Sequence, residues 1–260
     1  MKYINFLQRV LILLGKDSSK YLEYFFLNNN LLSLNIFPDC LKLEENIITS
    51  LKSDSKIIVK KTFNMFYQTV LQFNFPNDNI SEENKIFLNI FLEFIKTFGI
   101  ITLEIPEVFF ENGGIDNLIF LNLVEFILVT GNKFFEFSHR RTAVKSIRYL
   151  CKYFNKNKMI FETQQNFLDI INTILNNLFL VYKKNDRNNS IDMSNTIEIA
   201  NCHLFLLDFN NLYYNYLSKY LNQNEIEQFI IIIKNVDYKK LKTSDELLNA
   251  FDHIINNSFK

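Results

Sequence analysis

Residues 56–75 read KIIVKKTFNMFYQTVLQFNF, and their apolar side chains recur at the spacing of an α-helix. Five of them follow one another at steps of four, three, four and three residues, which places them on one helix face: Val59, Phe63, Phe66, Val70 and Phe73. No stretch of comparable length alternates apolar and polar side chains as a half-buried strand does. The stretch predicts a helix over 57–73 and favours an all-α fold.

Helical spacing continues through most of the chain. Helices are predicted over 2–14, 20–36, 57–73, 82–98, 115–130, 138–155, 161–182, 193–221, 225–235 and 244–257. Pro106 suits the first turn of a further short helix that stops at Gly113 and Gly114, and the polar segment 183–195 is interpreted as an exposed loop. Only five glycines occur, too few for the turns and phosphate loops of β-sandwiches or α/β enzymes. We expect an all-α fold, an irregular armadillo- or HEAT-like α-solenoid of about ten or eleven helices.

Composition and charge exclude several classes of protein. The chain has 260 residues, 48% of them hydrophobic, and its 28 basic and 28 acidic residues give a formal net charge of zero. The three cysteines are far apart in the sequence, which fits neither a disulfide framework nor a zinc site with paired ligands. No apolar run approaches the length of a membrane span, and the N-terminus lacks the cleavage site of a signal peptide. We expect a cytoplasmic protein in a reducing compartment.

Chemistry-bearing motifs of the common enzyme classes are absent from the sequence, which holds no Walker loop, GxGxxG, HExxH or GxSxG pattern. Cys202 and His203 are adjacent, so on a helix they point about 100° apart and do not form a nucleophile and base. The acidic pair Glu44 and Glu45 is interpreted as a helix start, where carboxylates favour the dipole, rather than as shielded acid–base groups. The prediction is a protein that is not an enzyme and has no catalytic residue, cofactor or metal.

One candidate binding site remains. It is the basic run SHRRTAVKSIRYLCKYFNKNK at 138–158, which contains seven Lys or Arg and no Asp or Glu. At 100° per residue, four of the cations fall within about 60° on one side of the helix, namely Arg141, Lys145, Arg148 and Lys152. Such a stripe suits RNA phosphates, anionic lipid headgroups or an acidic protein, and Tyr149 offers a stacking face. A merely solvated helix face is the competing interpretation. The candidate RNA- or partner-binding residues are Arg140, Arg141, Lys145, Arg148, Tyr149, Lys152, Lys156 and Lys158.

Three segments resemble the FPL domain of the Ema-type endosomal maturation proteins. FIKTFGIITLEIPEVFFEN at 94–112 is similar to a family pattern that leads through a Phe-Phe pair to Asn, and GKDSSKYLEYFFLNNNLL at 15–32 and RRTAVKSI at 140–147 are similar to two others. The Phe-Pro-Leu that names the domain corresponds to Phe120, Leu121 and Asn122, so its proline is missing. The resemblance implies an FPL-like helical-repeat region over 1–160, with 161–260 as a C-terminal helical extension packed on the same solenoid.

The resemblance also implies a function without catalysis. Large animal members act in endosomal trafficking and autophagy, whereas compact, domain-only microsporidian relatives act as dormancy factors on inactive ribosomes. We therefore expect a helical scaffold that binds rRNA and ribosomal proteins and blocks a functional site of the ribosome. The alternative is a trafficking or autophagy scaffold that binds vesicle-tethering proteins or an acidic membrane surface. Arg141 and Lys145 match basic positions of the family. The cations that extend the charge beyond this motif are therefore the stronger candidates for partner contact, namely Arg148, Lys152, Lys156 and Lys158.

Overall fold

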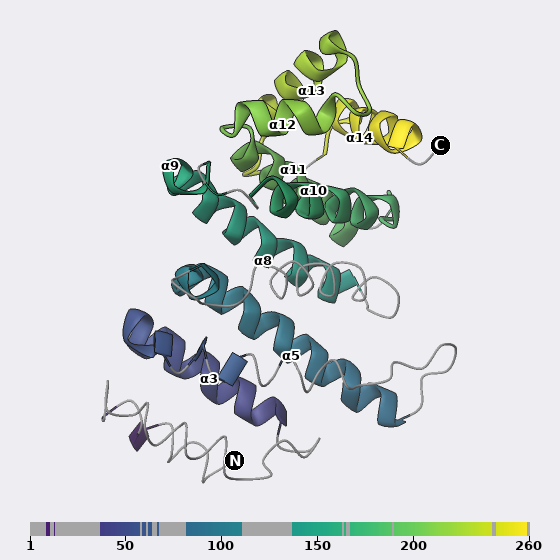
Figure 1. Cartoon of the computed structure of the whole chain (residues 1–260). Coiled ribbons are helices and arrows are strands. Elements are labelled where there is room, and N and C mark those ends of the chain that lie inside the picture. The colour runs from purple at the N-terminus through teal and green to yellow at the C-terminus, as the bar shows by residue number, and fades with distance from the viewer. Residues whose placement is uncertain are drawn as a thin grey trace. The chain divides into compact units, whose positions relative to one another are not determined.

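The computed structural model describes residues 9–10, 13, 37–57, 59–60, 62–63, 67, 82–110, 137–162, 164, 167–188, 190–240 and 243–258. Over these residues every regular element is a helix, nine of them α-helices, and none is a strand, so the all-α prediction is confirmed. The chain forms two compact units, Met1–Phe120 and Leu121–Lys260 (Figure 1). The predicted solenoid type and the predicted division at residue 160 stay predictions.

The first unit is described for two α-helices and two 3-10 helices. They are α3 (Phe37–Leu51), η2 (Lys52–Ser55), α5 (Glu82–Glu104) and η3 (Pro106–Phe109). Aromatic rings of α5 and η3 pack against Phe63, a member of the stretch 56–75, whose ring centroid lies 5.1 Å from that of Phe94 and 5.8 Å from that of Phe109. Val59 and Phe63 are buried, as their shared helix face predicted. The predictions for 2–14, 20–36 and 115–130 lie largely or wholly outside the described residues.

Helix α3 corrects the interpretation of Glu44 and Glu45 as a helix start. The helix begins at Phe37, so both residues lie in its middle. Glu44 is 1% exposed, and its Oε1 accepts a hydrogen bond of 2.5 Å from the Thr62 hydroxyl, while Glu45 accepts one of 2.9 Å from Thr97 on α5. Because Glu44 interrupts the apolar face formed by Cys40, Ile47 and Ile48, hydrophobic spacing did not reveal this helix.

The second unit is described for seven helices. They are α8 (Phe137–Lys156), α9 (Lys158–Phe161), α10 (Phe167–Lys183), α11 (Ser190–Leu206), α12 (Asn210–Leu217), α13 (Gln223–Asn235) and α14 (Asp245–Ser258). Helix α8 packs mainly against α11, and α14 contacts both α10 and α13. The predicted helices 138–155, 225–235 and 244–257 match α8, α13 and α14 within two residues at each end.

Two predicted helices differ from the structure. The range 161–182 corresponds to α10 but begins six residues too early, since only Phe161 of it belongs to α9, and the range 193–221 divides into α11 and α12. The break between α11 and α12 contains Phe209, which is 1% exposed and whose ring centroid lies 4.8 Å from that of Phe167 at the start of α10. At this break the side chain of Asp208 accepts a hydrogen bond of 2.5 Å from Asn155 Nδ2 on α8. The break therefore buries an aromatic ring and ties the turn to α8, which sequence spacing within 193–221 does not reveal.

The segment 183–195 is the exposed loop that its polar composition predicted only in its first half. Residues 184–188 connect α10 to α11 and are mostly exposed, but α11 begins at Ser190, and Asp192, Ser194 and Asn195 are buried. Across the described part of the chain, no helix combines the length and the hydropathy that a membrane crossing needs.

Candidate nucleic-acid interface

Helix α8 carries the basic run and has one mainly apolar buried side, although Arg140 and Ser146 are buried on this helix as well. Val144, Ile147, Leu150, Cys151 and Phe154 are each 0% exposed, so the predicted core side of this helix is confirmed. Apolar burial of this extent fixes which side of α8 meets water.

Four cations lie exposed on the opposite side and define what we call the cation row: Arg141, Lys145, Lys152 and Lys156. At 100° per residue they fall within about 60° of one another, and at 1.5 Å per residue they extend over about 22 Å. Within the described residues, no ion pair engages any of the four. The row is therefore a line of cations whose charge is not cancelled by a contacting carboxylate.

Arg148, predicted to belong to the stripe, turns instead toward α11. Its Nε lies 3.0 Å from Oε2 of Glu198, and the two side chains are 24% and 10% exposed. The guanidinium carbon of Arg148 also lies 5.1 Å from the ring centroid of Tyr149, a cation–π distance. One face of the half-buried Tyr149 ring is thus occupied by a cation of its own helix, which leaves less of the ring for stacking on a base.

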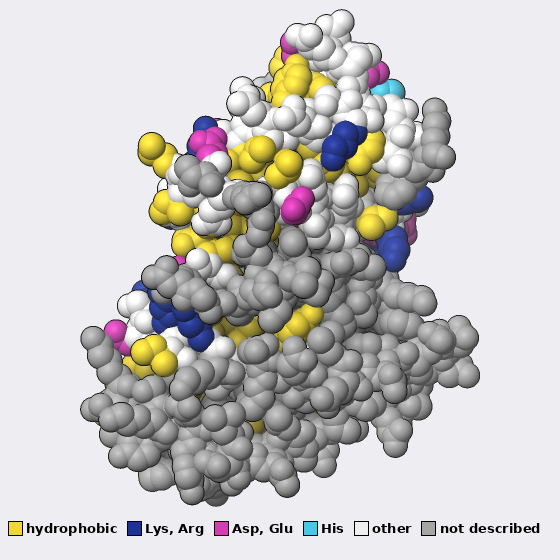
Figure 2. Space-filling model, viewed as in Figure 1, with side chains coloured by type: hydrophobic (Ala, Val, Ile, Leu, Met, Phe, Trp, Pro, Cys, Tyr) yellow, Lys and Arg dark blue, Asp and Glu magenta, His cyan; other side chains and the backbone are white. Residues whose placement is uncertain are grey.

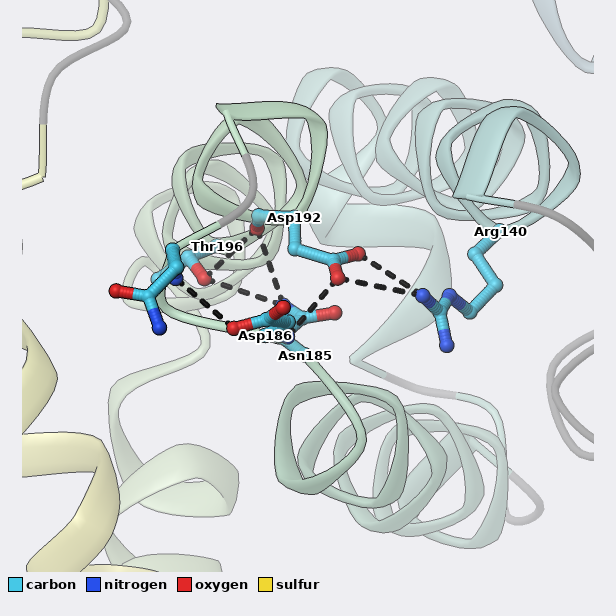
Figure 3. Close-up of polar contacts among 6 residues, drawn as sticks. Arg140, Asn185, Asp186, Asp192 and Thr196 are labelled. Atoms are coloured by element: carbon cyan, nitrogen blue, oxygen red, sulfur yellow. Dashed lines mark hydrogen bonds and ion pairs between the residues drawn. The ribbon is translucent and has the colours of Figure 1, made fainter.

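Arg140 is buried and belongs to a polar network between α8, α11 and the turn after α10 (Figure 3). Its Nη2 donates to both carboxylate oxygens of Asp192, at 3.0 and 3.3 Å. Asp192 Oδ2 also accepts from the backbone N–H of Asp186 at 2.9 Å, and the side chain of Asn185 donates to Asp192 O and Thr196 Oγ1. The network anchors the turn and the first turn of α11 to α8, so Arg140 holds helices together and does not face a partner.

The row ends at a small tip formed by the one-turn helix α9. Lys158 pairs with Glu162 at 3.4 Å, while Met159 and Ile160 are 85% and 60% exposed. Figure 2 shows hydrophobic side chains standing out at the place of α9, next to charged ones. We call Met159 and Ile160 the apolar tip. A large apolar residue that stays this exposed adds contact area for a partner at the end of a charged surface.

The eight predicted residues therefore divide by their surroundings. Four form the cation row, two arginines pair with buried or half-buried acids of α11, Tyr149 is half-buried, and Lys158 forms a surface pair. Sequence reasoning missed the two acids because they lie fifty or more residues away, in a segment interpreted as a loop or as ordinary helix. The apolar tip had a visible signal, two adjacent large apolar residues directly after Lys156 and Lys158.

The cysteines and histidines are mostly core residues. Cys40, Cys151 and Cys202 are buried free thiols. His203 is 0% exposed, its Nδ1 lies 2.7 Å from the Tyr213 hydroxyl, and burial lowers its pKa to about 3. In the described residues, no three His, Cys, Asp or Glu side chains gather closely enough to hold a metal ion.

Glu44 is a carboxyl group that is almost completely buried. Burial raises its pKa to about 8, against a smaller lowering by the Thr62 hydroxyl and a raising by Glu45. Burial also raises the pKa of Glu45. A neutral carboxyl at pH 7 is one requirement of a general acid. Neither of the two cavities lined by described residues includes Glu44.

Comparison with known proteins gives no relative. No protein-family model, curated protein or solved structure matches the chain. The resemblance to the FPL domain therefore rests on the three sequence segments alone.

Proposed function

We propose that this protein is a non-enzymatic helical scaffold that docks on the ribosome as a dormancy factor, with the cation row of α8 on rRNA phosphates. The observation that carries the proposal is that the cations of α8 fall into two groups, one paired with carboxylates of α11 and one exposed. Arg140 and Arg148 are neutralised inside the unit by Asp192 and Glu198. Arg141, Lys145, Lys152 and Lys156 share one exposed side and have no ion-pair partner among the residues that the structure describes.

The charge of the row acts locally. The whole chain has a net charge of zero, so long-range attraction to any polyanion is weak, and a Debye length of about 8 Å at physiological salt confines the field of the row to its neighbourhood. A surface of this kind favours a partner whose shape brings phosphates into register with α8. Structured RNA bound to a rigid assembly meets that requirement better than a flexible single strand does.

The apolar tip supports a mixed partner surface. Met159 and Ile160 have no phosphate-binding chemistry, but they suit contact with a protein or with an unstacked base. Ribosomal surfaces offer RNA and protein side by side, so one docking event can engage both the row and the tip. The mechanism is occupancy: a rigid helical body that covers a tRNA or factor site stops translation without bond chemistry.

Binding to phosphates predicts a strong salt dependence. Each neutralised phosphate contributes a slope of about 0.7 to 0.9 in log K against log salt concentration, so four contacts give a slope of about 3 to 3.5. A fourfold rise in salt then weakens binding by about 50- to 150-fold.

The decisive experiment compares the protein with a charge-reversed variant, Arg141→Glu, Lys145→Glu, Lys152→Glu and Lys156→Glu, by sucrose-gradient sedimentation with purified ribosomes. A control variant makes the same change in net charge at exposed lysines outside α8: Lys183→Glu, Lys219→Glu, Lys234→Glu and Lys239→Glu. We expect the natural protein and the control to co-sediment with ribosomes at low salt and the α8 variant to stay at the top of the gradient.

Equal sedimentation of the two variants with ribosomes contradicts the role of the cation row. If the natural protein itself does not sediment with ribosomes, the dormancy function is wrong. Co-purification with vesicle-tethering proteins or flotation with anionic vesicles then supports the trafficking alternative.

A further inference from the structure

Helices α13 and α14 enclose a groove of about 380 Å³ that lies outside the cation row. Each helix contributes four residues at positions i, i+3, i+4 and i+7, starting from Glu225 on α13 and from Glu246 on α14. This spacing places all four on one side of each helix. The groove is therefore formed by two regular helix faces.

The two helices run antiparallel along the groove. Glu225, in the first turn of α13, forms an ion pair of 2.9 Å with His253, near the end of α14. The side chain of Asn257, one turn after His253, donates to the backbone carbonyl of Tyr220, just before α13. Seven residues of each helix cover about 10 Å at 1.5 Å per residue, close to two turns of a third helix. These contacts hold the two walls of the groove at a fixed separation at one end.

The floor of the groove is apolar. Leu221 and Phe229 are buried beneath it, while Ile232 and Ala250 are half-buried and reach its surface. The ring centroid of Phe229 lies 5.8 Å from that of Phe251, so the floor is continuous with the core of the unit. Apolar surface of this kind gains free energy when a partner covers it.

The rim of the groove is acidic. The carboxylate of Glu225 accepts from the backbone N–H of Asn222 at 2.8 Å and from His253, which fixes its position. The Asn222 N–H lowers the pKa of Glu225, with a further lowering by His253. Glu246 is exposed at the other end, and no ion pair engages it within the described residues. The groove thus has an apolar floor between two carboxylates.

We propose that this groove docks an amphipathic helix of a partner protein, with large apolar side chains against Ile232 and Ala250 and Lys or Arg beside Glu225 and Glu246. Charge complementarity selects this occupant, because the two carboxylates repel nucleic acid and anionic lipid. Helix-in-groove recognition uses anchors at i, i+3, i+4 and i+7, the same periodicity that each wall presents. The inference concerns a surface separate from the cation row and does not depend on ribosome binding.

The test uses the full chain as bait in a display selection from a library of helical peptides with randomised outer positions. Selected peptides are synthesised, and their affinities are measured by isothermal titration calorimetry. We expect enrichment of large apolar residues on one face with Lys or Arg at its flanks. Ala250→Arg fills the floor and is expected to lower affinity about tenfold or more. The matched control Gln223→Arg adds the same charge to α13 on the side away from the groove and is expected to leave affinity unchanged.

Reversal of the charge at Glu246 gives a second test that leaves the apolar floor of the groove unchanged. Glu246→Lys is expected to weaken the selected peptides, and peptides with Glu in place of the flanking Lys or Arg are expected to regain affinity for that variant. Peptides without basic enrichment, or with equal affinity for Ala250→Arg, overturn the proposal. Concentration-dependent dimers in sedimentation equilibrium that Ala250→Arg abolishes also overturn it, since they assign the groove to a second copy of the chain.

Discussion

The guanidinium of Arg140 on α8 donates from Nη2 to both carboxylate oxygens of Asp192 on α11, and the two side chains are 9% and 0% exposed. The pair joins residues fifty-two positions apart in the sequence. Because two buried charges are costly to desolvate, such a pair contributes little net stability but strongly penalises loss of one partner. It also selects the alignment of α8 against α11 in which the two side chains meet.

The first prediction follows from this asymmetry. Arg140→Met leaves the Asp192 carboxylate buried and without its guanidinium, and we expect it to lower the free energy of unfolding by about 3–5 kcal/mol. The measurement is equilibrium urea denaturation followed by circular dichroism.

The neighbouring exposed change Arg141→Met is the control for Arg140→Met and is expected to alter stability by no more than about 0.5 kcal/mol. Addition of Asp192→Asn to Arg140→Met is expected to recover part of the loss, because the amide removes the buried charge. Equal stability of the two single variants contradicts a structural role for Arg140.

A second prediction distinguishes the role of Lys145, in the cation row, from that of Arg148, which is paired with Glu198. Lys145→Gln is expected to reduce the slope of log K against log salt for ribosome binding by about 0.7 to 0.9, one phosphate contact, with unchanged stability. Arg148→Gln is expected to keep the slope and to destabilise the protein, because Glu198 loses its partner. Binding isotherms at several salt concentrations measure both. The interpretation fails if Arg148→Gln lowers the slope and Lys145→Gln does not.

A third prediction concerns the pH dependence of stability in the first unit. The folded-state pKa of Glu44 is raised from 4.5 to about 8, so the folded unit holds a proton that the unfolded chain releases between these values. The free energy of unfolding therefore falls as pH rises from about 4.5 to about 8, by about 5 kcal/mol in total. Glu44→Gln keeps the shape without an ionisable group and is expected to flatten this fall. Hydrogen exchange of α3 and α5 amides against pH measures it, and an unchanged profile contradicts burial of a carboxyl group.

His203 predicts the opposite slope in the second unit. Its folded-state pKa is lowered from 6.5 to about 3, so the unfolded chain binds a proton in this range that the folded unit does not. The free energy of unfolding falls as pH decreases from about 6.5 to about 3, again by about 5 kcal/mol. We expect His203→Gln, which can still bond the Tyr213 hydroxyl, to be less sensitive to acid. Denaturation of both proteins at pH 7 and pH 4.5 tests this, and an equal loss of stability on acidification counts against the assignment.

The fold was predictable where apolar spacing was continuous. Helices α8, α13 and α14 match their predicted ranges closely because each buries a face on which apolar side chains recur at helical spacing. Helix α3 escaped prediction because the buried Glu44 lies in its apolar face, and the break between α11 and α12 escaped because Phe209 turns inward to meet Phe167. In both cases the deciding contact is made with a residue distant in sequence.

The candidate site was predictable in part for the same reason. The spacing of Arg141, Lys145, Lys152 and Lys156 along α8 follows from the sequence, since a helix face depends only on positions three and four residues apart. Nothing in that spacing distinguishes them from Arg140 and Arg148, whose acidic partners belong to α11. The groove between α13 and α14 was also not predicted, because it depends on how two helix faces lie side by side.

The amino-acid sequence by itself determined that this protein is all-α and that one helix carries a concentrated positive charge, because both properties arise from local periodicity. Only the tertiary structure decided which of those cations are exposed and which are neutralised inside the protein. Exposure and charge pairing depend on carboxylates that the fold brings from fifty or more residues away, and the cost of burying an unpaired charge makes that placement decisive.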